Sequence, residues 1–280
     1  MSESRIGKTV GGRYLIEAKV GEGGQSAVYR AKDVRAGRDV AIKIMHAKMA
    51  EDLHARERMN REASALVNLA SAPAALKIFD QCWTTDGCMC LVTELLNGVD
   101  LDDYLTQRGD VLPVFEIILL LSPIIDTLEM AHAQGVIHRD LKPGNIFIVK
   151  EPSGVRLLDF GFAKFANLAS FTVAGSVAGS PRYIAPEAWM GKKDLDLRID
   201  VYAIGTLIFR CLVGSTPFPA DTMILLLRAV TQDPRPSLYA LRPDLPAAID
   251  PWLQQALAID RDQRFQNVRS LWESFISVVS

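Results

Sequence analysis

The sequence predicts an α+β fold of two lobes, a small β-rich lobe followed by a larger, mainly helical one. The chain has 280 residues, which is long for one hydrophobic core and favours two lobes or domains. Short apolar runs that suit strands gather before residue 95, whereas helical patterns dominate after it. We expect an N-terminal extension at 1–13, the small lobe at 14–96 and the larger lobe at 97–280.

Composition and charge argue against several classes of protein. Hydrophobic residues make up 49% of the chain, which is enough to pack a core and too much for a disordered chain. The net charge of −2 gives no broad attraction to nucleic acid or to an anionic membrane. The four cysteines have no histidine partners in a metal-binding pattern, so we interpret them as reduced thiols of a cytoplasmic protein.

No targeting or membrane-spanning segment is predicted. The first eight residues are polar and do not form the apolar core of a signal peptide. The most apolar run, 111–128, contains Glu116, Asp126 and two prolines. We therefore expect a buried helix over 113–135, kinked at Pro123, rather than a membrane span.

The small lobe is expected to begin with two strands around a glycine-rich turn, over 14–20 and 21–29. Glycines let backbone amides approach phosphate oxygens, although such a hairpin is more often only a turn. A strand over 40–43 then ends in Lys43, which could pair with phosphates or simply reach solvent from an edge strand. A helix is predicted over 52–69, and further strands over 76–79 and 89–94.

The stretch 138–145 is one short predicted loop in which a carboxylate, an ammonium group and an amide stand close together in the sequence, at Asp140, Lys142 and Asn145. The apolar runs 135–137 and 146–149 are expected to hold this loop as two buried strands. Asp159 follows Asn145 by fourteen residues. Phosphoryl transfer needs an oriented hydroxyl, metal ions and cations on the developing charge, and these side chains can supply them. A lone His-Arg-Asp triplet, by contrast, is usually only a surface turn.

The run His138-Arg139-Asp140-Leu141-Lys142-Pro143-Gly144-Asn145, followed by Asp159-Phe160-Gly161, resembles the catalytic and metal-binding loops of protein kinases. The glycine-rich hairpin, Val40-Ala41-Ile42-Lys43 and Ala185-Pro186-Glu187 extend the resemblance over about 14–275. Lys142-Pro143 resembles serine/threonine kinases, and the style of the glycine loop is similar to the bacterial eukaryotic-like branch. The resemblance implies the two-lobed protein-kinase fold as a single catalytic domain.

The resemblance also implies roles for particular residues. Asp140 would orient the substrate hydroxyl and accept its proton, and Lys142 would neutralise charge on the phosphoryl group. Asn145 and Asp159 would hold Mg²⁺, with Mn²⁺ as a possible substitute. Glu62, rather than the solvent-facing Glu57, would pair with Lys43. The residues expected to bind ATP are Gly21, Glu22, Gly23, Gly24, Gln25, Ser26, Val28, Ala41, Lys43, Glu62, Thr93, Glu94, Leu96 and Asp159.

Three further matches concern the larger lobe. A helix over 200–213 carries Asp200, which in the family hydrogen-bonds the backbone of the catalytic loop. Arg264 matches the arginine that pairs with Glu187 as a structural contact. The segment 162–182 is similar to an activation segment, in which Thr172, with Ser170 and Ser176 as alternatives, would place a phosphate near Arg139.

The expected function is transfer of the γ-phosphoryl group of ATP to serine or threonine of protein substrates, with autophosphorylation of the activation segment through transient self-association. Two alternatives remain. A nucleotide-binding pseudokinase scaffold would lack one of the essential Lys, Asp or Asn residues, and none is missing. A small-molecule kinase of related fold would generally lack the Ala-Pro-Glu segment and its pairing arginine. No nucleic-acid partner and no membrane insertion are expected.

Overall fold

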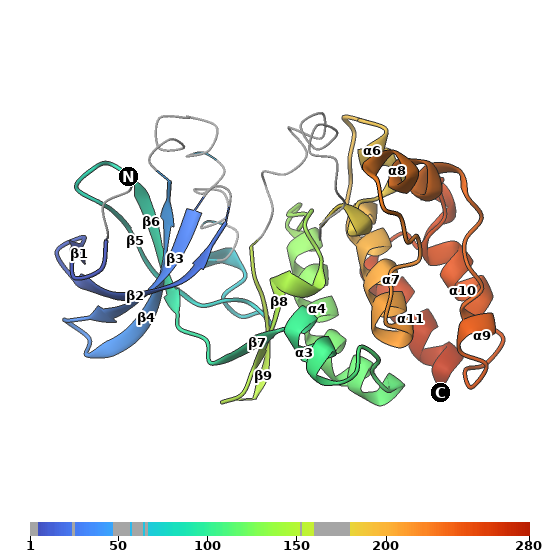
Figure 1. Ribbon diagram of the computed structural model, residues 1–280, viewed down its shortest axis with the longest axis horizontal. Helices are drawn as coiled ribbons and strands as arrows, with labels where there is room; N and C mark the ends of the chain where they lie inside the picture. The colour runs from blue at the N-terminus through green and yellow to red at the C-terminus, as the bar shows by residue number, and fades with distance from the viewer. Residues whose placement is uncertain are drawn as a thin grey trace. The chain divides into compact units, whose positions relative to one another are not determined.

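Figure 1 shows the computed structural model, which describes residues 5–23, 26–46, 57, 64, 67–151, 153–159 and 180–280, with residue 180 described in its backbone alone. The chain divides into two compact units. The first comprises Met1–Ser71 and Ala75–Asn97, and the second comprises Ala72–Ala74 and Gly98–Ser280. The predicted β-rich first part and mainly helical second part are confirmed.

The first unit is built on an antiparallel sheet with the strand order β1-β2-β3-β4-β6-β5. Alternate residues of its strands enter one core, as Tyr14 and Ile16 do from β2 and Val40 and Ile42 from β4. Period-2 burial of this kind is typical of strands with one face against a core. The strands are β1 Thr9–Val10, β2 Tyr14–Glu22, β3 Ser26–Asp33, β4 Arg38–Met45, β5 Ile78–Trp83 and β6 Met89–Glu94.

Most of the expected helix over 52–69 falls outside the described residues. Of its five described positions, 57, 64, 67 and 68 are helical and 69 is in a turn. Glu57 is exposed, as the sequence predicted. The strand expected at 76–79 begins at Ile78 and runs on to Trp83.

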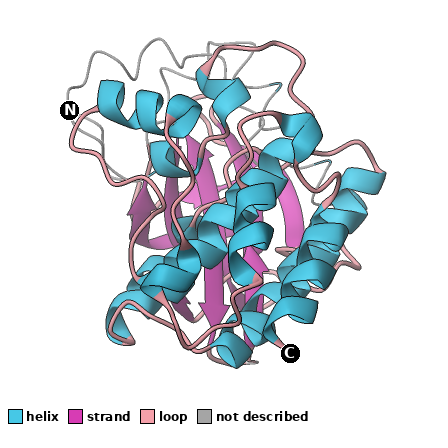
Figure 2. Ribbon diagram, turned by 90° about the vertical axis from the view of Figure 1, so that its right-hand side faces the viewer, coloured by secondary structure: helices cyan, strands magenta, loops and turns pink. Residues whose placement is uncertain are grey.

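The second unit joins a small sheet to a set of helices, of which α4, α7 and α11 are the longest (Figure 2). α11 packs against α4, α7 and α10, and α7 is buried along nearly its whole length. The sheet has the order β7-β8-β9, with β7 Gly98–Asp100, β8 Ile146–Val149 and β9 Gly154–Leu157. The helices are α3 Leu101–Gln107, α4 Val114–Ala133, α6 Pro186–Trp189, α7 Arg198–Val213, α8 Met223–Gln232, α9 Leu238–Leu241, α10 Ile249–Ala256 and α11 Val268–Val279. Among the described residues, short 3₁₀ turns are η1 Pro143–Asn145, η3 Ser180–Tyr183 and η4 Arg261–Gln263.

Helix ends follow the expected capping chemistry. The Asp100 carboxylate accepts a hydrogen bond from the Asp103 amide at 2.9 Å and starts α3. Gly214 adopts φ 85° and ends α7, as predicted. α4 continues through Pro123. The carbonyl that loses its partner there belongs to Leu119, whose residue is 70% exposed, so water can satisfy it.

The strand predicted over 135–137 is not present, and this expectation is wrong. Gly135 has φ 72°, and the amide of Val136 donates to the carbonyl of Ala131 at 2.9 Å. These residues therefore close the C-terminus of α4 instead of pairing with a strand. The run over 146–149 does form the predicted strand, between β7 and β9.

Candidate active site

One buried carboxylate, that of Asp200, fixes the backbone of the loop 138–145. Asp200, in the first turn of α7, is 1% exposed. Its Oδ2 accepts a hydrogen bond from the His138 amide at 2.8 Å, and its Oδ1 accepts one from the Arg139 amide at 2.9 Å. Arg139 itself adopts φ 69°, a left-handed conformation that is unfavourable for a side chain with a Cβ. The two amide bonds account for how the loop keeps this conformation, and they confirm the contact predicted for Asp200.

His138 ties the loop to the residue before Asp159. Its Nδ1 lies 3.3 Å from the Asp140 amide, and its Nε2 lies 3.0 Å from the carbonyl of Leu158. An amide donor on Nδ1 and a carbonyl acceptor at Nε2 require the neutral ring with its proton on Nε2. Burial lowers the pKa of His138, in agreement with a neutral ring. His138 therefore acts as a structural link that sets the direction of the loop.

Asp140, Lys142 and Asn145 converge at the end of this loop. The Asn145 amide nitrogen donates both to Oδ2 and to the main-chain oxygen of Asp140, each at 2.7 Å. The Lys142 ammonium lies 3.5 Å from the same Oδ2. Asp140 is thus fixed by an amide and a cation, while the oxygen of the Asn145 amide is the atom left to face a metal ion.

Asp159 is joined to the loop through its neighbour. The Leu158 amide donates to the carbonyl of Asn145 at 2.8 Å, directly beside the His138 contact to Leu158. Asp159 itself is exposed and has φ 50°, a conformation that aspartate tolerates better than most residues. The carboxylate of Asp159 and the amide oxygen of Asn145 form a hard oxygen donor set of the kind that Mg²⁺ prefers.

The nucleotide-binding residues expected in the small lobe share adjacent rungs of the first unit's sheet. Val28 pairs with Gly21 on one side and with Lys43 on the other, and Ala41 pairs with Thr93. Thr93 is buried and ends β6 together with Glu94. Glu22 ends β2, Gly23 follows it, and Ser26 opens β3. Leu96 follows in the segment after β6. Gly24, Gln25 and Glu62 lie outside the described residues.

A cavity of about 500 Å³ opens beside Lys142 and Asn145 within the second unit. Its described lining includes Asp102, Arg182 and Arg210. The Arg182 guanidinium donates to the carbonyls of Phe218 and Ala220, whereas Arg210 pairs with Asp110 at 2.7 Å. The sequence did not single out Arg182 or Arg210, because they are separated along the chain and belong to no local motif.

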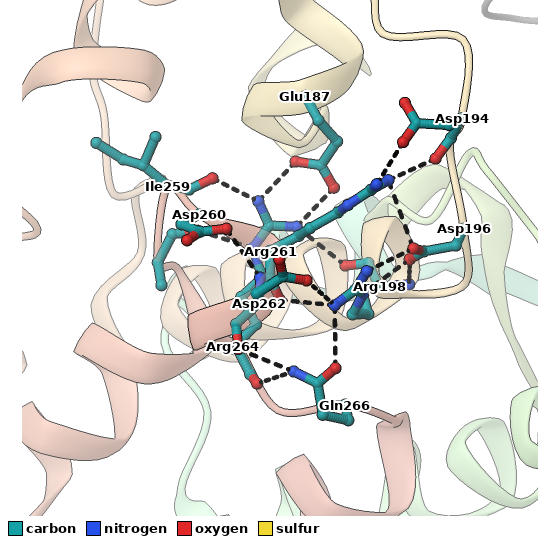
Figure 3. A network of polar contacts seen from close by, with 11 residues as sticks. Glu187, Asp194, Asp196, Arg198, Ile259, Asp260, Arg261, Asp262, Arg264 and Gln266 are labelled. Carbon is teal, nitrogen blue, oxygen red and sulfur yellow. Dashed lines mark hydrogen bonds and ion pairs between the residues drawn. The ribbon is translucent and has the colours of Figure 1, made fainter.

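The Glu187–Arg264 pair anchors the segment that follows the cavity (Figure 3). Both side chains are almost fully buried, and two hydrogen bonds of 2.7 and 2.6 Å join them. Arg264 also donates to the carbonyls of Ala258 and Ile259, and a second group of ion pairs around Arg198 and Arg261 lies beside it. The predicted structural pair is confirmed.

His132 was missed by the sequence reasoning. It sits near the end of α4, and its Nε2 lies 2.8 Å from Oδ2 of Asp200. A single histidine on a helix carries no signal of this role, because its partner is 68 residues further along the chain.

Comparison with known proteins agrees with this geometry. The protein kinase domain pattern matches residues 14–273, so the chain belongs to the protein kinase family. It is 38% identical to the serine/threonine-protein kinase PknL of Mycobacterium bovis over 76% of this chain and 52% of that protein. It is 34% identical to the probable serine/threonine-protein kinase PknB of Lactococcus lactis over 95% of this chain and 42% of that protein.

The solved kinase domain of Mycobacterium tuberculosis PknI has 27% sequence identity and a TM-score of 0.75, with 99% of each chain covered. The predicted fold and the resemblance to bacterial serine/threonine kinases are confirmed. The chain spans about half the length of the curated relatives it matches. No helix in the described part of the chain has both the length and the apolar character needed to cross a bilayer.

Proposed function

We propose that this chain is a serine/threonine protein kinase that transfers the γ-phosphoryl group of ATP to hydroxyls of protein substrates. The observation that carries the proposal is Asp140, held by the Asn145 amide at 2.7 Å and faced by the Lys142 ammonium at 3.5 Å. A carboxylate fixed in this way can orient a hydroxyl and accept its proton. Lys142 places a positive charge where negative charge develops on the transferred group.

The nucleotide would lie against the glycine-rich hairpin and the strands that carry Lys43 and Thr93. Asn145 and Asp159 would hold Mg²⁺, and Mn²⁺ suits the same oxygen donors. The metal would supply charge neutralisation on the phosphates. The residues of the chain itself position the acceptor hydroxyl, take its proton and keep the loop rigid through Asp200. We place the protein in the cytoplasm, where ATP is abundant and its four free cysteines would stay reduced.

We also propose that a phosphate on the segment 162–182 regulates activity. Among the residues that the structure describes, the buried Nε atom of Arg139 has no hydrogen-bond partner. A buried donor of a cation without a partner favours an anion nearby. A phosphate brings about −1.5 to −2 charges and three acceptor oxygens, and it could order the segment by pairing with Arg139. Thr172 is the first candidate, with Ser170 and Ser176 as alternatives, and the reaction would require transient self-association.

The test uses the purified chain with radiolabelled ATP, Mg²⁺ or Mn²⁺ and a generic basic protein, alone and beside candidate metabolites. Label is expected on serine and threonine of the protein, and Asp140→Asn, Lys43→Met and Asp159→Asn should each abolish most of it. The loss corresponds to several kcal/mol in the barrier, of the order seen when transition-state charge loses its partner. Lys193→Met, an exposed lysine, serves as the matched control.

Thermal melts show whether each variant is folded. Near-normal transfer by Asp140→Asn would overturn the catalytic assignment. Nucleotide binding without transfer by the wild type would favour a pseudokinase scaffold, and label on a metabolite alone would favour a small-molecule kinase.

A further inference from the structure

Three of the four cysteines lie on or directly beside two neighbouring strands of the first unit's sheet. Cys82 in β5 is directly opposite Cys90 in β6, and Cys88 comes just before β6. All are free thiols, and Cys211 belongs to α7 in the other unit. The proposed kinase chemistry uses none of them, so the pairing of Cys82 with Cys90 needs its own explanation.

Cross-strand geometry suits a bond between Cys82 and Cys90. Directly opposed residues of an antiparallel pair have Cα atoms about 4.5–5.5 Å apart. Disulfides bridge Cα atoms about 4.4–6.8 Å apart, so this pair needs no backbone movement. Cys88 and Cys90 are two residues apart along one extended segment, about 6.6–6.8 Å, with parallel side chains. That second pair is at the limit of the range and is poorly directed.

The two opposed sulfurs have unequal surroundings. Cys90 is fully buried in the core beside Ile42 and Val92, whereas Cys82 is only partly buried, on the edge strand of the sheet. Gly11 faces Cys82, and a Cβ at Gly11 would stand 3.3 Å from the Cys82 sulfur. The chain therefore passes close to this sulfur at Gly11, and the access of a small molecule to the sulfur depends on the partial exposure of Cys82.

The chemistry of the two thiols differs in the same direction. The neighbouring Cys90 thiol lowers the pKa of Cys82. The neighbouring Cys82 thiol, together with burial, raises the pKa of Cys90. Since the thiolate is the reactive form, Cys82 is the nucleophile of the pair. Cys90 is the resolving thiol, which reacts with Cys82 after Cys82 has been oxidised.

We propose that Cys82 and Cys90 are a reversible oxidation site, in which a peroxide converts the two thiols into a cross-strand disulfide. The Cys82 thiolate attacks one peroxide oxygen, the O–O bond breaks, and the departing hydroxide takes up a proton to leave as water. The Cys90 sulfur then attacks the Cys82 sulfenic acid, the S–O bond breaks, and the Cys90 proton leaves with the hydroxyl as a second water. Two thiols are oxidised to one disulfide while one hydrogen peroxide is reduced to two waters.

The experiment treats the whole reduced chain with hydrogen peroxide, then unfolds it in denaturant, blocks the remaining thiols with an alkylating agent and records intact mass and a non-reducing peptide map. We expect two of the four cysteines to escape alkylation and one peptide pair, joined through Cys82 and Cys90. Dithiothreitol should restore four reactive thiols. The oxidised form should also melt at a higher temperature, because the cross-link restricts the unfolded chain.

Single alanine variants separate the roles. Cys82→Ala should form no disulfide, whereas Cys90→Ala should accumulate a sulfenic acid at Cys82 that dimedone traps. Cys88→Ala and Cys211→Ala are matched controls and should form the disulfide as the wild type does. A Cys82–Cys88 link, or four alkylated cysteines after treatment with excess peroxide, would overturn the proposal. These readouts do not involve phosphotransfer, so they are independent of the proposed kinase activity.

Discussion

The imidazole of His132 and the carboxylate of Asp200 form a buried pair, with Nε2 and Oδ2 separated by 2.8 Å. The same carboxylate receives the amides of His138 and Arg139. One side chain thus accepts three donors from two elements, α4 and the loop that carries Asp140. The position of Asp140 therefore depends on a pair that touches no proposed substrate atom.

Replacing Asp200 by asparagine should loosen this loop. The asparagine amide has one acceptor oxygen, and its NH₂ group would point at a donor, so at least one buried donor loses its partner. The expected cost is about 1–3 kcal/mol of unfolding free energy, with a fall in phosphotransfer. Denaturant melts and kinase assays of Asp200→Asn and the exposed control Asp221→Asn would measure both. Identical behaviour of the two variants would contradict the positioning role.

Because of the His132–Asp200 pair, the stability of the wild type and that of Asp200→Asn should depend differently on pH. Burial alone would raise the pKa of Asp200, but hydrogen bonds from His132 and the Arg139 amide, with the nearby imidazoles, lower it overall. A carboxyl with a depressed folded pKa stabilises the protein above its unfolded pKa, about 3.9, and that stabilisation disappears as the pH falls through the folded value. The wild type should therefore lose more stability than Asp200→Asn on acidification below about pH 4.

Local patterns in the sequence predicted what depends on neighbours along the chain. Short apolar runs located β4 and β6, and Gly214 marked the end of α7. The short strands β1 and β7 have too few residues to alternate, and they exist only because a partner strand lies beside them. The run 135–137 is apolar like a strand, yet its backbone closes a helix because no partner strand is offered to it. The pattern of apolar residues in a sequence indicates which residues are buried, but it does not show whether a partner strand is present to pair with them.

The residues of the candidate site also fall into two groups, those that a local sequence pattern brings together and those that only tertiary packing brings together. Asp140, Lys142 and Asn145 stand within six residues, so their convergence follows from one loop. Asp200 and Arg264 were identified only through the family resemblance, since no local pattern links Arg264 to Glu187, 77 residues away. His132, Arg182 and Arg210 meet their partners through tertiary packing alone. Single-sequence reasoning had no means of finding them.

Breaking the Glu187–Arg264 pair should destabilise the second unit strongly. Arg264→Met leaves the Glu187 carboxylate buried without its cation, and removal of one partner of a buried pair costs about 3–5 kcal/mol. Arg261→Met is the matched control, because Arg261 is 20% exposed and its pairs with Asp194 and Asp196 are partly solvated. The control should cost about 0–1 kcal/mol. Equal losses in the two variants, measured by denaturant unfolding, would contradict this assignment.

The proposed phosphorylation of the segment 162–182 predicts a modification that depends on Asp140, the proposed catalytic residue. Peptide mapping after incubation with ATP and Mg²⁺ should find phosphate on this segment in the wild type and none in Asp140→Asn. Thr172→Ala should lower activity, and Arg139→Gln should lower it to a similar degree, since the phosphate then has no guanidinium to bind. An unphosphorylated wild-type segment, together with full activity of the combined Ser170, Thr172 and Ser176 alanine variant, would exclude the switch.

The cavity beside Asn145 predicts a preference for acidic substrates. Its described lining has three cations, Lys142, Arg182 and Arg210, and one carboxylate, Asp102. The Arg182 guanidinium donates its hydrogen bonds to carbonyls, and its charge has no carboxylate partner among the described residues. A peptide with Asp or Glu beside the acceptor serine or threonine should be phosphorylated with a higher kcat/KM than its Lys counterpart. A partly exposed pair contributes about 0.5–1 kcal/mol, which corresponds to about two- to five-fold. Arg182→Gln should reduce the difference in kcat/KM between the acidic and the Lys peptide, whereas the exposed control Arg228→Gln should leave that difference unchanged. Equal rates for acidic and basic peptides in the wild type would show that these cations do not select the substrate.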